Sequence, residues 1–360
     1  VMLLPMYFLI GMWGGPQREY AAIKFFLYTL FGSVLMLVGI LGLYFTCGKT
    51  FDILLIMERA PEALDGVLWW GMSAAKVIWV LLFIGFAIKV PVFPFHTWLP
   101  LAHVEAPTAI SVILAGILLK LGVYGIIRVN YGILPNAVWW FSGGLAILGL
   151  VNVIWGGLCA LAQTDLKKLV AYSSINHMGY LLFGLGSLSV YGLAGAEMMY
   201  VSHALGKGLL FMTAGVLIVN VGTRSIAKLG GLAGKMPITA VCAVIGALTI
   251  MGVPPTSGFM GEWMLFYGAL ETALEEGNDL RSIMFALGLV ATALTMSYLL
   301  WMLKRVFFGK LPENLQNVKE GSWYMTIPMM VLAGFSIVVG IYPDIFLKTI
   351  IPYMNGVMGV

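Results

Sequence analysis

The chain has 360 residues, of which 61% are hydrophobic and 10% are charged, and its mean hydropathy is +0.97. Soluble domains carry about 25% charged residues, so this composition excludes an ordinary soluble domain and predicts an all-α polytopic membrane protein. The net charge is only +4, and the basic residues are scattered between apolar stretches, which gives no support to nucleic-acid binding. The three cysteines lack CxxC spacing, so we expect neither a metal site nor an iron–sulfur cluster here.

Apolar stretches recur along the whole chain. A helix that crosses a bilayer needs about 20 apolar residues. The candidate spans lie near residues 1–12, 22–46, 76–100, 107–129, 137–163, 168–190, 192–221, 237–273, 282–308 and 324–347. The first is too short to cross, and Val1 stands where an initiator methionine would, so we expect further spans before it. The polar segment 47–66 is too short for a domain and predicts a hairpin or a surface helix.

Charge is distributed unevenly between the loops. Most lysines and arginines follow the first, third, fifth, seventh and ninth spans, as at Lys167 and Arg224. The opposite loops carry acidic clusters within 52–65 and 271–279. The positive-inside rule places the basic loops in the cytoplasm or its equivalent. We expect a bacterial or archaeal cell membrane, with the mitochondrial inner membrane or the thylakoid as alternatives.

Four ionisable residues lie inside apolar stretches, namely Lys89, Lys120, Lys207 and Glu262. A charge at the bilayer centre costs roughly 3 kcal/mol or more, so residues of this kind usually have a function. Burial disfavours the charged form of an amine or carboxyl group, which lets such a group take up and release a proton. The alternatives are snorkelling of Lys89 to the interface and a helix N-cap role for Glu262.

Histidines accompany these charges. His203 and Lys207 are spaced i,i+4 on one helical face, and His177 lies in the middle of the preceding span. Because histidine titrates nearest neutral pH, the pattern predicts a proton relay, although each histidine alone could be structural. Glu197 is expected to cap its helix or to face the interface. Three further residues are candidate accessory sites: Lys24 near the start of the second span, and His96 and His103, which could line an exit or lie at the headgroups.

Two spans are interrupted by prolines in a similar way. Pro91 and Pro94 follow Lys89, and Pro254 and Pro255 precede Glu262. Proline removes a backbone donor, and a broken helix at membrane depth persists only where protein or water satisfies the freed groups. A simple kink is the alternative for either break alone. The breaks fall in the third and eighth spans, and this odd offset requires opposite orientations, as in the inverted repeats of transporters.

Long motifs carry a family resemblance. The stretch FAIKVPVFPFHTWLPLAHVEAPTAISVILAGILLKLGVYGIIR, with ALAQTDLKKLVAYSSINHMGY and GVPPTSGFMGEW, resembles the antiporter-like subunits of respiratory complex I. LPMYFLIGMWGG, AAIKFFLYT and the glutamate at position 262 point to the M type, the mitochondrial chain-four type. The resemblance implies two inverted five-helix units with broken helices. In one transmembrane domain, 1–360, residues 1–129 would end the first repeat, 137–308 would form the second, and 324–347 would be an additional span.

The resemblance also implies residue roles. Lys89 resembles the family's pump lysine, Lys120 its central relay lysine and Glu262 its terminal carboxylate. His177 and His203 resemble the connecting histidines, with Lys207 beside them. The glutamate partner of the pump lysine would fall before Val1, and Leu101 stands where many members have aspartate.

The implied assembly is a complex I-type NAD(P)H/quinone oxidoreductase, in which this chain translocates protons beside neighbouring antiporter-like subunits in the bilayer. No cofactor is expected in this chain, whereas quinone, FMN and iron–sulfur clusters are expected in partner subunits.

Other function classes remain open from the residues. A subunit of a multi-chain cation/proton antiporter or of a membrane-bound hydrogenase shares the fold. A b-type cytochrome could use His177 and His203 as axial ligands, although a second ligand pair is missing. Motifs of self-contained enzymes, such as GxSxG, HExxH and the P-loop, are absent from the sequence.

Overall fold

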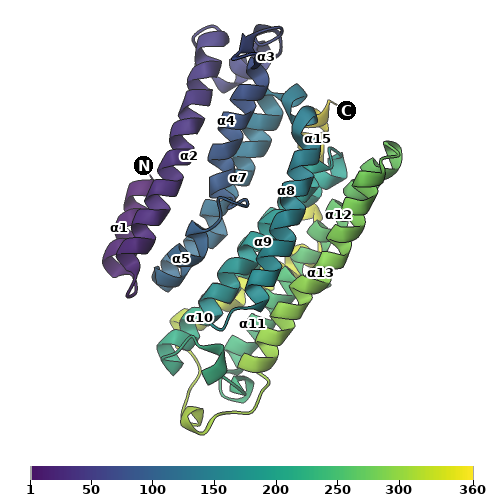
Figure 1. Ribbon diagram of the computed structural model, residues 1–360. Coiled ribbons are helices and arrows are strands. Elements are labelled where there is room, and N and C mark those ends of the chain that lie inside the picture. The colour runs from purple at the N-terminus through teal and green to yellow at the C-terminus, as the bar shows by residue number, and fades with distance from the viewer. Residues whose placement is uncertain (1, 360) are drawn as a thin grey trace.

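A computed structural model describes residues 2–359. Its helices are α1 (Leu3–Trp13), α2 (Arg18–Thr46), α3 (Ile53–Ala63), α4 (Ala74–Lys89), α5 (Trp98–Glu105), α6 (Thr108–Ile113), α7 (Leu119–Gly125), α8 (Pro135–Leu161), α9 (Leu166–Gly186), α10 (Val190–Val221), α11 (Pro237–Ile250), α12 (Ser257–Glu275), α13 (Asp279–Val306), α14 (Trp323–Ile341) and α15 (Asp344–Met358). Two strands, β1 (Leu68–Trp69) and β2 (Met72–Ser73), pair antiparallel. The predicted all-α architecture is confirmed (Figure 1).

Short helical turns complete the secondary structure. The π-helical turn η1 (Leu114–Leu118) joins α6 to α7, and the π-helical turn η2 (Ile126–Tyr131) extends α7, so that these elements form one span. The turns η3 (Ile226–Lys228), η4 (Leu232–Gly234) and η5 (Glu313–Leu315) are 3₁₀ turns. Within residues 2–359, six segments are long and apolar enough to cross a membrane, with this joined span among them. The predicted surface helix in the polar segment 47–66 is also confirmed, because α3 lies there, and the β1–β2 hairpin follows just after the segment.

The loops gather at two ends of the bundle (Figure 1). The basic end carries loops 14–17, 106–107, 162–165, 222–236 and 307–322. The acidic end carries loops 47–73, 132–134, 187–189, 276–278 and 342–343. This division is the one that the alternation of charged loops predicts.

Helix α9 lies at the centre of the bundle. It contacts α5, α8, α10, α12 and α13, and nearly all of its residues are buried. Glycines allow the close approach to α8, since a methyl group on Gly179 would lie 2.5 Å from the carbonyl oxygen of Gly149. Small residues play this part in membrane helix packing because they let backbones touch. The central helix is therefore surrounded by protein.

The two broken helices share the same hydrogen-bond pattern at the break, although they cross the bundle in opposite directions. In the α4–α5 break, the amide of Val92 donates to the carbonyl of Ala87, five residues back, at 2.8 Å. In the α11–α12 break, the amide of Val253 donates to Leu248, also five residues back, at 3.0 Å. The first pair runs toward the basic end and the second toward the acidic end. This relationship supports the inverted repeat predicted from the odd offset.

Side chains from other helices form hydrogen bonds with the backbone groups that the first break leaves without helical partners. The amide group of Asn152, from α8, accepts a hydrogen bond from the backbone of Phe93 at 2.7 Å and donates to the carbonyl of Pro91 at 3.2 Å. The indole of Trp98 donates to the carbonyl of Ile88 at 2.9 Å. Protein groups thus supply the partners that a broken helix needs within a bilayer.

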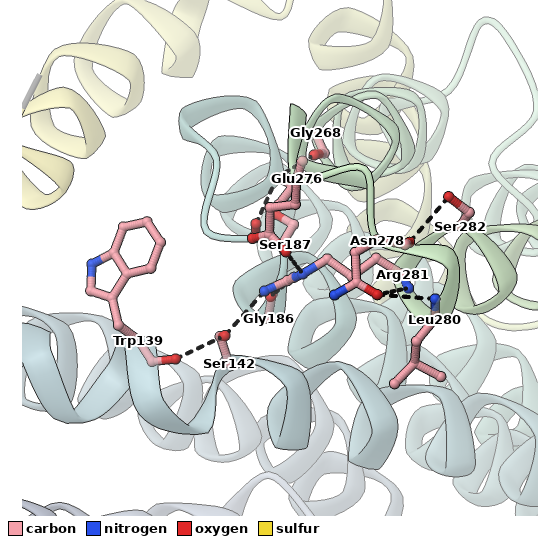
Figure 2. A network of polar contacts seen from close by, with 11 residues as sticks. Trp139, Ser142, Gly186, Ser187, Gly268, Glu276, Asn278, Leu280, Arg281 and Ser282 are labelled. Carbon is pink, nitrogen blue, oxygen red and sulfur yellow. Dashed lines mark hydrogen bonds and ion pairs between the residues drawn. The ribbon is translucent and has the colours of Figure 1, made fainter. Parts of the chain in front are cut away.

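Arg281 ties three helix ends together at the acidic end (Figure 2). Its guanidinium pairs with Glu276 at 2.6 Å and donates to the carbonyl of Gly186 at 2.9 Å and to the hydroxyl of Ser142 at 3.2 Å. Asn278 caps α13 by accepting from the backbone of Leu280 and of Arg281 itself. The arginine therefore links α13 to α8, to the α9–α10 turn and to the end of α12.

The end of α5 is held at the basic end by two cations. Lys167 donates to the carbonyl of Ala106 at 2.7 Å. Arg224 donates to the carbonyl of Val104 at 2.9 Å and pairs with Asp165 at 2.6 Å. Cations are favourable at a helix C-terminus, where carbonyl groups lack helical partners. The second half of the chain thus anchors the second half of the first broken helix.

Candidate functional site

Lys120 and His203 form the centre of the candidate site. The Lys120 amine hydrogen-bonds to His203 Nδ1 and to the carbonyl of Ala115. Both side chains are buried, with 1% of Lys120 and none of His203 exposed. Lys120 lies between the π-helical turns η1 and η2, and π-helical turns frequently occur at functional sites. The structure thus excludes snorkelling of Lys120.

His177 extends this pair into α9. Its ring lies 5.6 Å from that of His203 between centroids, and it is also buried. No side chain of the described residues hydrogen-bonds to either nitrogen of His177 or to Nε2 of His203, and the backbone of Ile250 lies near His177. A buried polar nitrogen normally has a partner, often an internal water molecule. The two histidines therefore offer hydrogen-bonding positions that neighbouring side chains leave open.

Lys207 joins α10 to α9 rather than to its neighbour His203. Its amine donates to the hydroxyl of Ser173 and to the carbonyl of Val170 at 3.3 Å. It is fully buried. The i,i+4 spacing correctly predicted that Lys207 lies in the same buried region as His203. The two residues nevertheless bond to different partners, His203 to Lys120 and Lys207 to Ser173.

A network of uncharged residues continues from this point. Asn176 Oδ1 accepts from the hydroxyls of Thr295 at 3.0 Å and Tyr298 at 3.2 Å, and Thr295 pairs with Tyr180 at 3.2 Å. Ser173 lies within hydrogen-bonding reach of Tyr298. None of these residues was predicted from the sequence, because only ionisable side chains within apolar stretches were taken as candidates. The available signal was the polar run of residues 173–177 within an apolar span.

Glu262 lies beyond that network. Tyr180 and Tyr298 both lie within electrostatic range of its carboxylate. Glu262 is the sixth residue of α12, so the N-cap alternative is excluded. It lines a largely apolar pocket of about 330 Å³ between α12 and α13, with Gly252 and Trp263. The Glu262 carboxylate thus lies between the Asn176 network on one side and this pocket on the other.

Lys89 ends α4 at the first break and is half-buried. Gly122, two residues after Lys120, would bring a methyl group within 3.1 Å of the Lys89 Cβ, so the lysine packs on the helix that carries the centre of the site. No hydrogen bond to another described residue fixes its amine. Lys24 approaches the ring of Tyr20 at 5.8 Å and lies within electrostatic range of His96.

Two histidines that were expected to line an exit or to lie at the headgroups are both buried. His103 is fully buried, stacks on Phe211 with centroids 4.4 Å apart, and lies within electrostatic range of Lys120, Lys167 and Lys207. His96 is also buried and accepts from the indole of Trp155 at 3.1 Å. The physical reason is that α5 continues inside the bundle, where it packs on α2 and α9.

The structure excludes one of the two positions expected for Glu197. It lies well inside α10, which begins at Val190, so it does not cap the helix. It is half-buried at the edge of the bundle. For a metal, residues 2–359 contain no group of three or more His, Cys, Asp or Glu side chains placed to bind an ion.

Comparison with known proteins places this geometry in a family. Residues 1–276 match the family described as NADH:quinone oxidoreductase/Mrp antiporter, TM. The chain belongs to this family. The NADH-quinone oxidoreductase subunit M of Rickettsia bellii (strain RML369-C) is 42% identical over 352 residues, which cover 97% of this chain and 67% of that protein. The match spans about two thirds of this relative.

Solved structures agree with the family. A chain of respiratory complex I from Thermus thermophilus with bound NADH matches with a TM-score of 0.88 and 28% identity, covering 99% of this chain and 72% of that one. A chain of the Mrp complex from Dietzia sp. DQ12-45-1b matches with a TM-score of 0.87 at 21% identity, covering 99% and 72%, which shows the shared fold. The protein is a multi-pass integral membrane member with the antiporter-like fold, and the Rickettsia relative is bacterial.

Proposed function

We propose that this chain is a proton-translocating membrane subunit of a complex I-type NADH:quinone oxidoreductase. The single observation that carries the proposal is the buried Lys120–His203 pair, which joins two distant helices at the centre of the bundle. A structural lysine would be paired with a carboxylate or would reach the interface. Lys120 instead binds a histidine, which can exchange a proton with it.

The relay runs across the bundle in an order set by contact. Lys89 takes up a proton near the first break and passes it to Lys120, which bonds to His203. From His203 the proton reaches His177 and Lys207, with internal water molecules on the open histidine nitrogens. The hydroxyl and amide groups around Asn176 then lead to Glu262. This order places His203 before His177.

Energy for the transfer must come from other subunits. The relatives' name assigns quinone reduction by NADH to the complex as a whole. We infer that quinone, FMN and iron–sulfur clusters lie in partner subunits and that this chain binds none of them. Neighbouring antiporter-like subunits and the lipid bilayer are its expected surroundings. The broken helices supply elements with two possible arrangements, which coupling at a distance requires.

A cation/proton antiporter or membrane-bound hydrogenase subunit is the second candidate, since the Mrp complex shares the fold. The 42% identity to a protein named as an oxidoreductase subunit favours the first.

Replacement of Lys120 by methionine in the assembled complex tests the proposal. Proton pumping in membrane vesicles should be lost or strongly reduced with NADH and quinone supplied. Normal pumping in a fully assembled Lys120→Met complex refutes the relay, and loss of Na⁺/H⁺ exchange without NADH dependence favours the antiporter.

A further inference from the structure

Glu197, which has no part in the proposed relay, lies between the Lys120–His203 pair and the acidic end. Glu197 belongs to α10, six residues before His203, and α10 runs from the acidic end to the basic end. At a rise of 1.5 Å per residue, Glu197 therefore lies about 9 Å closer to the acidic end than His203 does. A carboxylate this far inside an apolar helix is costly and therefore needs a reason.

Two tyrosines fill the interval between the Lys120–His203 pair and Glu197. Tyr124 follows Lys120 by four residues on its own span, and Tyr200 precedes His203 by three on α10. The two spans run in opposite directions, so both tyrosines lie on the acidic side of the pair. Tyr200 lies within electrostatic range of both Glu197 and Tyr124. Two hydroxyl groups, which can donate and accept protons, thus lie at heights between the pair and the carboxylate.

Glu197 is free of structural partners within residues 2–359, where it forms no hydrogen bond or ion pair. The nearest candidate cation on the neighbouring span, Arg128, donates instead to the hydroxyl of Tyr353 on α15 at 3.3 Å. Glu197 and Tyr200 are half-buried, and 53% of Tyr124 is exposed. The three side chains therefore lie on the side of the buried pair that leads to the edge of the bundle.

We propose that Glu197 is a second proton-releasing carboxylate, which serves the Lys120–His203 pair through Tyr200 and Tyr124 and opens toward the acidic end. This inference rests on the proposed proton translocation and adds to it an exit that is separate from Glu262. An N–H bond of the Lys120 ammonium breaks, and a proton is delivered through His203 and the hydroxyl groups to the Glu197 carboxylate, where an O–H bond forms. Lys120 is left as a neutral amine. The Glu197 O–H bond then breaks to water at the acidic end, which restores the carboxylate.

The test compares three variants in the fully assembled complex, reconstituted in vesicles. Glu197→Gln keeps the size of the side chain but cannot carry the proton, so we expect NADH-driven proton pumping to fall by roughly half, the share of one of two exits. Glu197→Asp should recover most of the lost pumping, because a carboxylate remains. Glu275→Gln removes an exposed acid at the same end and should pump like the wild type. Pumping by Glu197→Gln at the wild-type rate overturns the inference.

A measurement on the wild-type complex covers the case in which Glu197→Gln does not assemble. A hydrophobic carbodiimide reacts with protonated carboxyl groups in apolar surroundings, and peptide mass spectrometry identifies the modified residue. We expect modification of Glu197 that decreases as the pH rises. Modification of Glu262 with none at Glu197 overturns the inference.

Failure of this inference is distinguishable from failure of the proposed function. If Lys120→Met abolishes pumping and Glu197→Gln does not, translocation stands and only the second exit is wrong. If both variants pump normally, the proposed function is also wrong.

Discussion

Lys120 and His203 share a hydrogen bond across the centre of the bundle, although 83 residues separate them in the chain. The lysine comes from the span that follows the first broken helix, and the histidine from the helix that precedes the second. The bond thus joins the two halves of the inverted repeat.

Proton transfer should require a side chain at position 120 that can lose its positive charge. Lys120→Arg keeps a positive charge that cannot be released, because arginine does not deprotonate in proteins. We expect proton pumping by the assembled complex to fall by roughly one to two orders of magnitude. Pumping is measured by a pH-sensitive dye in sealed vesicles. Lys310→Arg, at an exposed position of the basic end, is the control, and equal pumping by both variants contradicts a relay role for Lys120.

Glu262 should be replaceable only by another acid. Glu262→Gln removes the proton acceptor while preserving the packing against Gly252, so pumping should fall by roughly half, with the remaining protons leaving through Glu197, and Glu262→Asp should restore part of the loss. The ratio of protons pumped to NADH oxidised measures the effect. Glu313→Gln, an exposed acid at the basic end, should leave the ratio unchanged. A normal ratio in Glu262→Gln would exclude this residue as an exit.

The hydroxyl of Tyr298 should contribute to transfer between the histidines and Glu262. Tyr298→Phe deletes only the oxygen that donates to Asn176, so the fold should persist while pumping slows several-fold, as expected when one group of a proton path is lost. Turnover of the assembled complex in H₂O and D₂O reports the change, with a larger isotope effect expected in the variant. Tyr324→Phe, at an exposed position on α14, is the matched control. An unchanged rate and isotope effect would remove Tyr298 from the path.

Asn152 should stabilise the first helix break. Asn152→Ala leaves the backbone groups of Pro91 and Phe93 without their partners, at a cost of about 1–3 kcal/mol for each buried group. The unfolding temperature of the purified complex should fall. Asn136→Ala changes an exposed asparagine near the start of the same helix and should have little effect. Equal unfolding temperatures for the two variants would show that the break does not depend on Asn152.

Arg281 should stabilise the acidic end without taking part in transfer. Arg281→Gln removes the ion pair with Glu276 and weakens the contact with Gly186, for which hydrogen bonds to a charged group suggest about 1.5–3 kcal/mol each. We expect a lower unfolding temperature with the pumping ratio preserved below that temperature. Lys348→Gln, an exposed residue of α15, controls for the loss of a positive charge. A changed pumping ratio would assign Arg281 a role in transfer.

Charge was the feature that made the site predictable from the sequence. Lys120, Lys207 and Glu262 stand out in apolar stretches, and the structure gathers Lys120, His203, His177 and Lys207 in one buried region. Proline likewise marked both breaks. Asn176, Thr295 and Tyr298 gave no such signal, because a hydroxyl or amide group is tolerated at many positions in a membrane helix.

The remaining errors have a common cause in three-dimensional packing. Sequence spacing relates residues on one helix, so it paired His203 with Lys207, whereas the structure gives each a partner on another helix. It also left His103 open between an exit and a headgroup position, since it could not show that α5 packs within the bundle. Glu197 was expected to cap its helix or to face the interface, and the structure, in which α10 begins seven residues earlier at Val190, excludes the cap.

The enclosure of α9 by its neighbours has a consequence for how the chain enters the bilayer during synthesis. A helix that touches protein on nearly every side gains little from acyl chains, so its sequence is free to carry Ser173, Asn176 and His177. It is absent from the segments of residues 2–359 that qualify as spans by length and hydropathy. Its integration must therefore depend on α8 and α10, which would hold it as a hairpin partner before the bundle closes. The polarity that allows proton transfer is thus tolerated during biogenesis because the flanking helices are strongly hydrophobic.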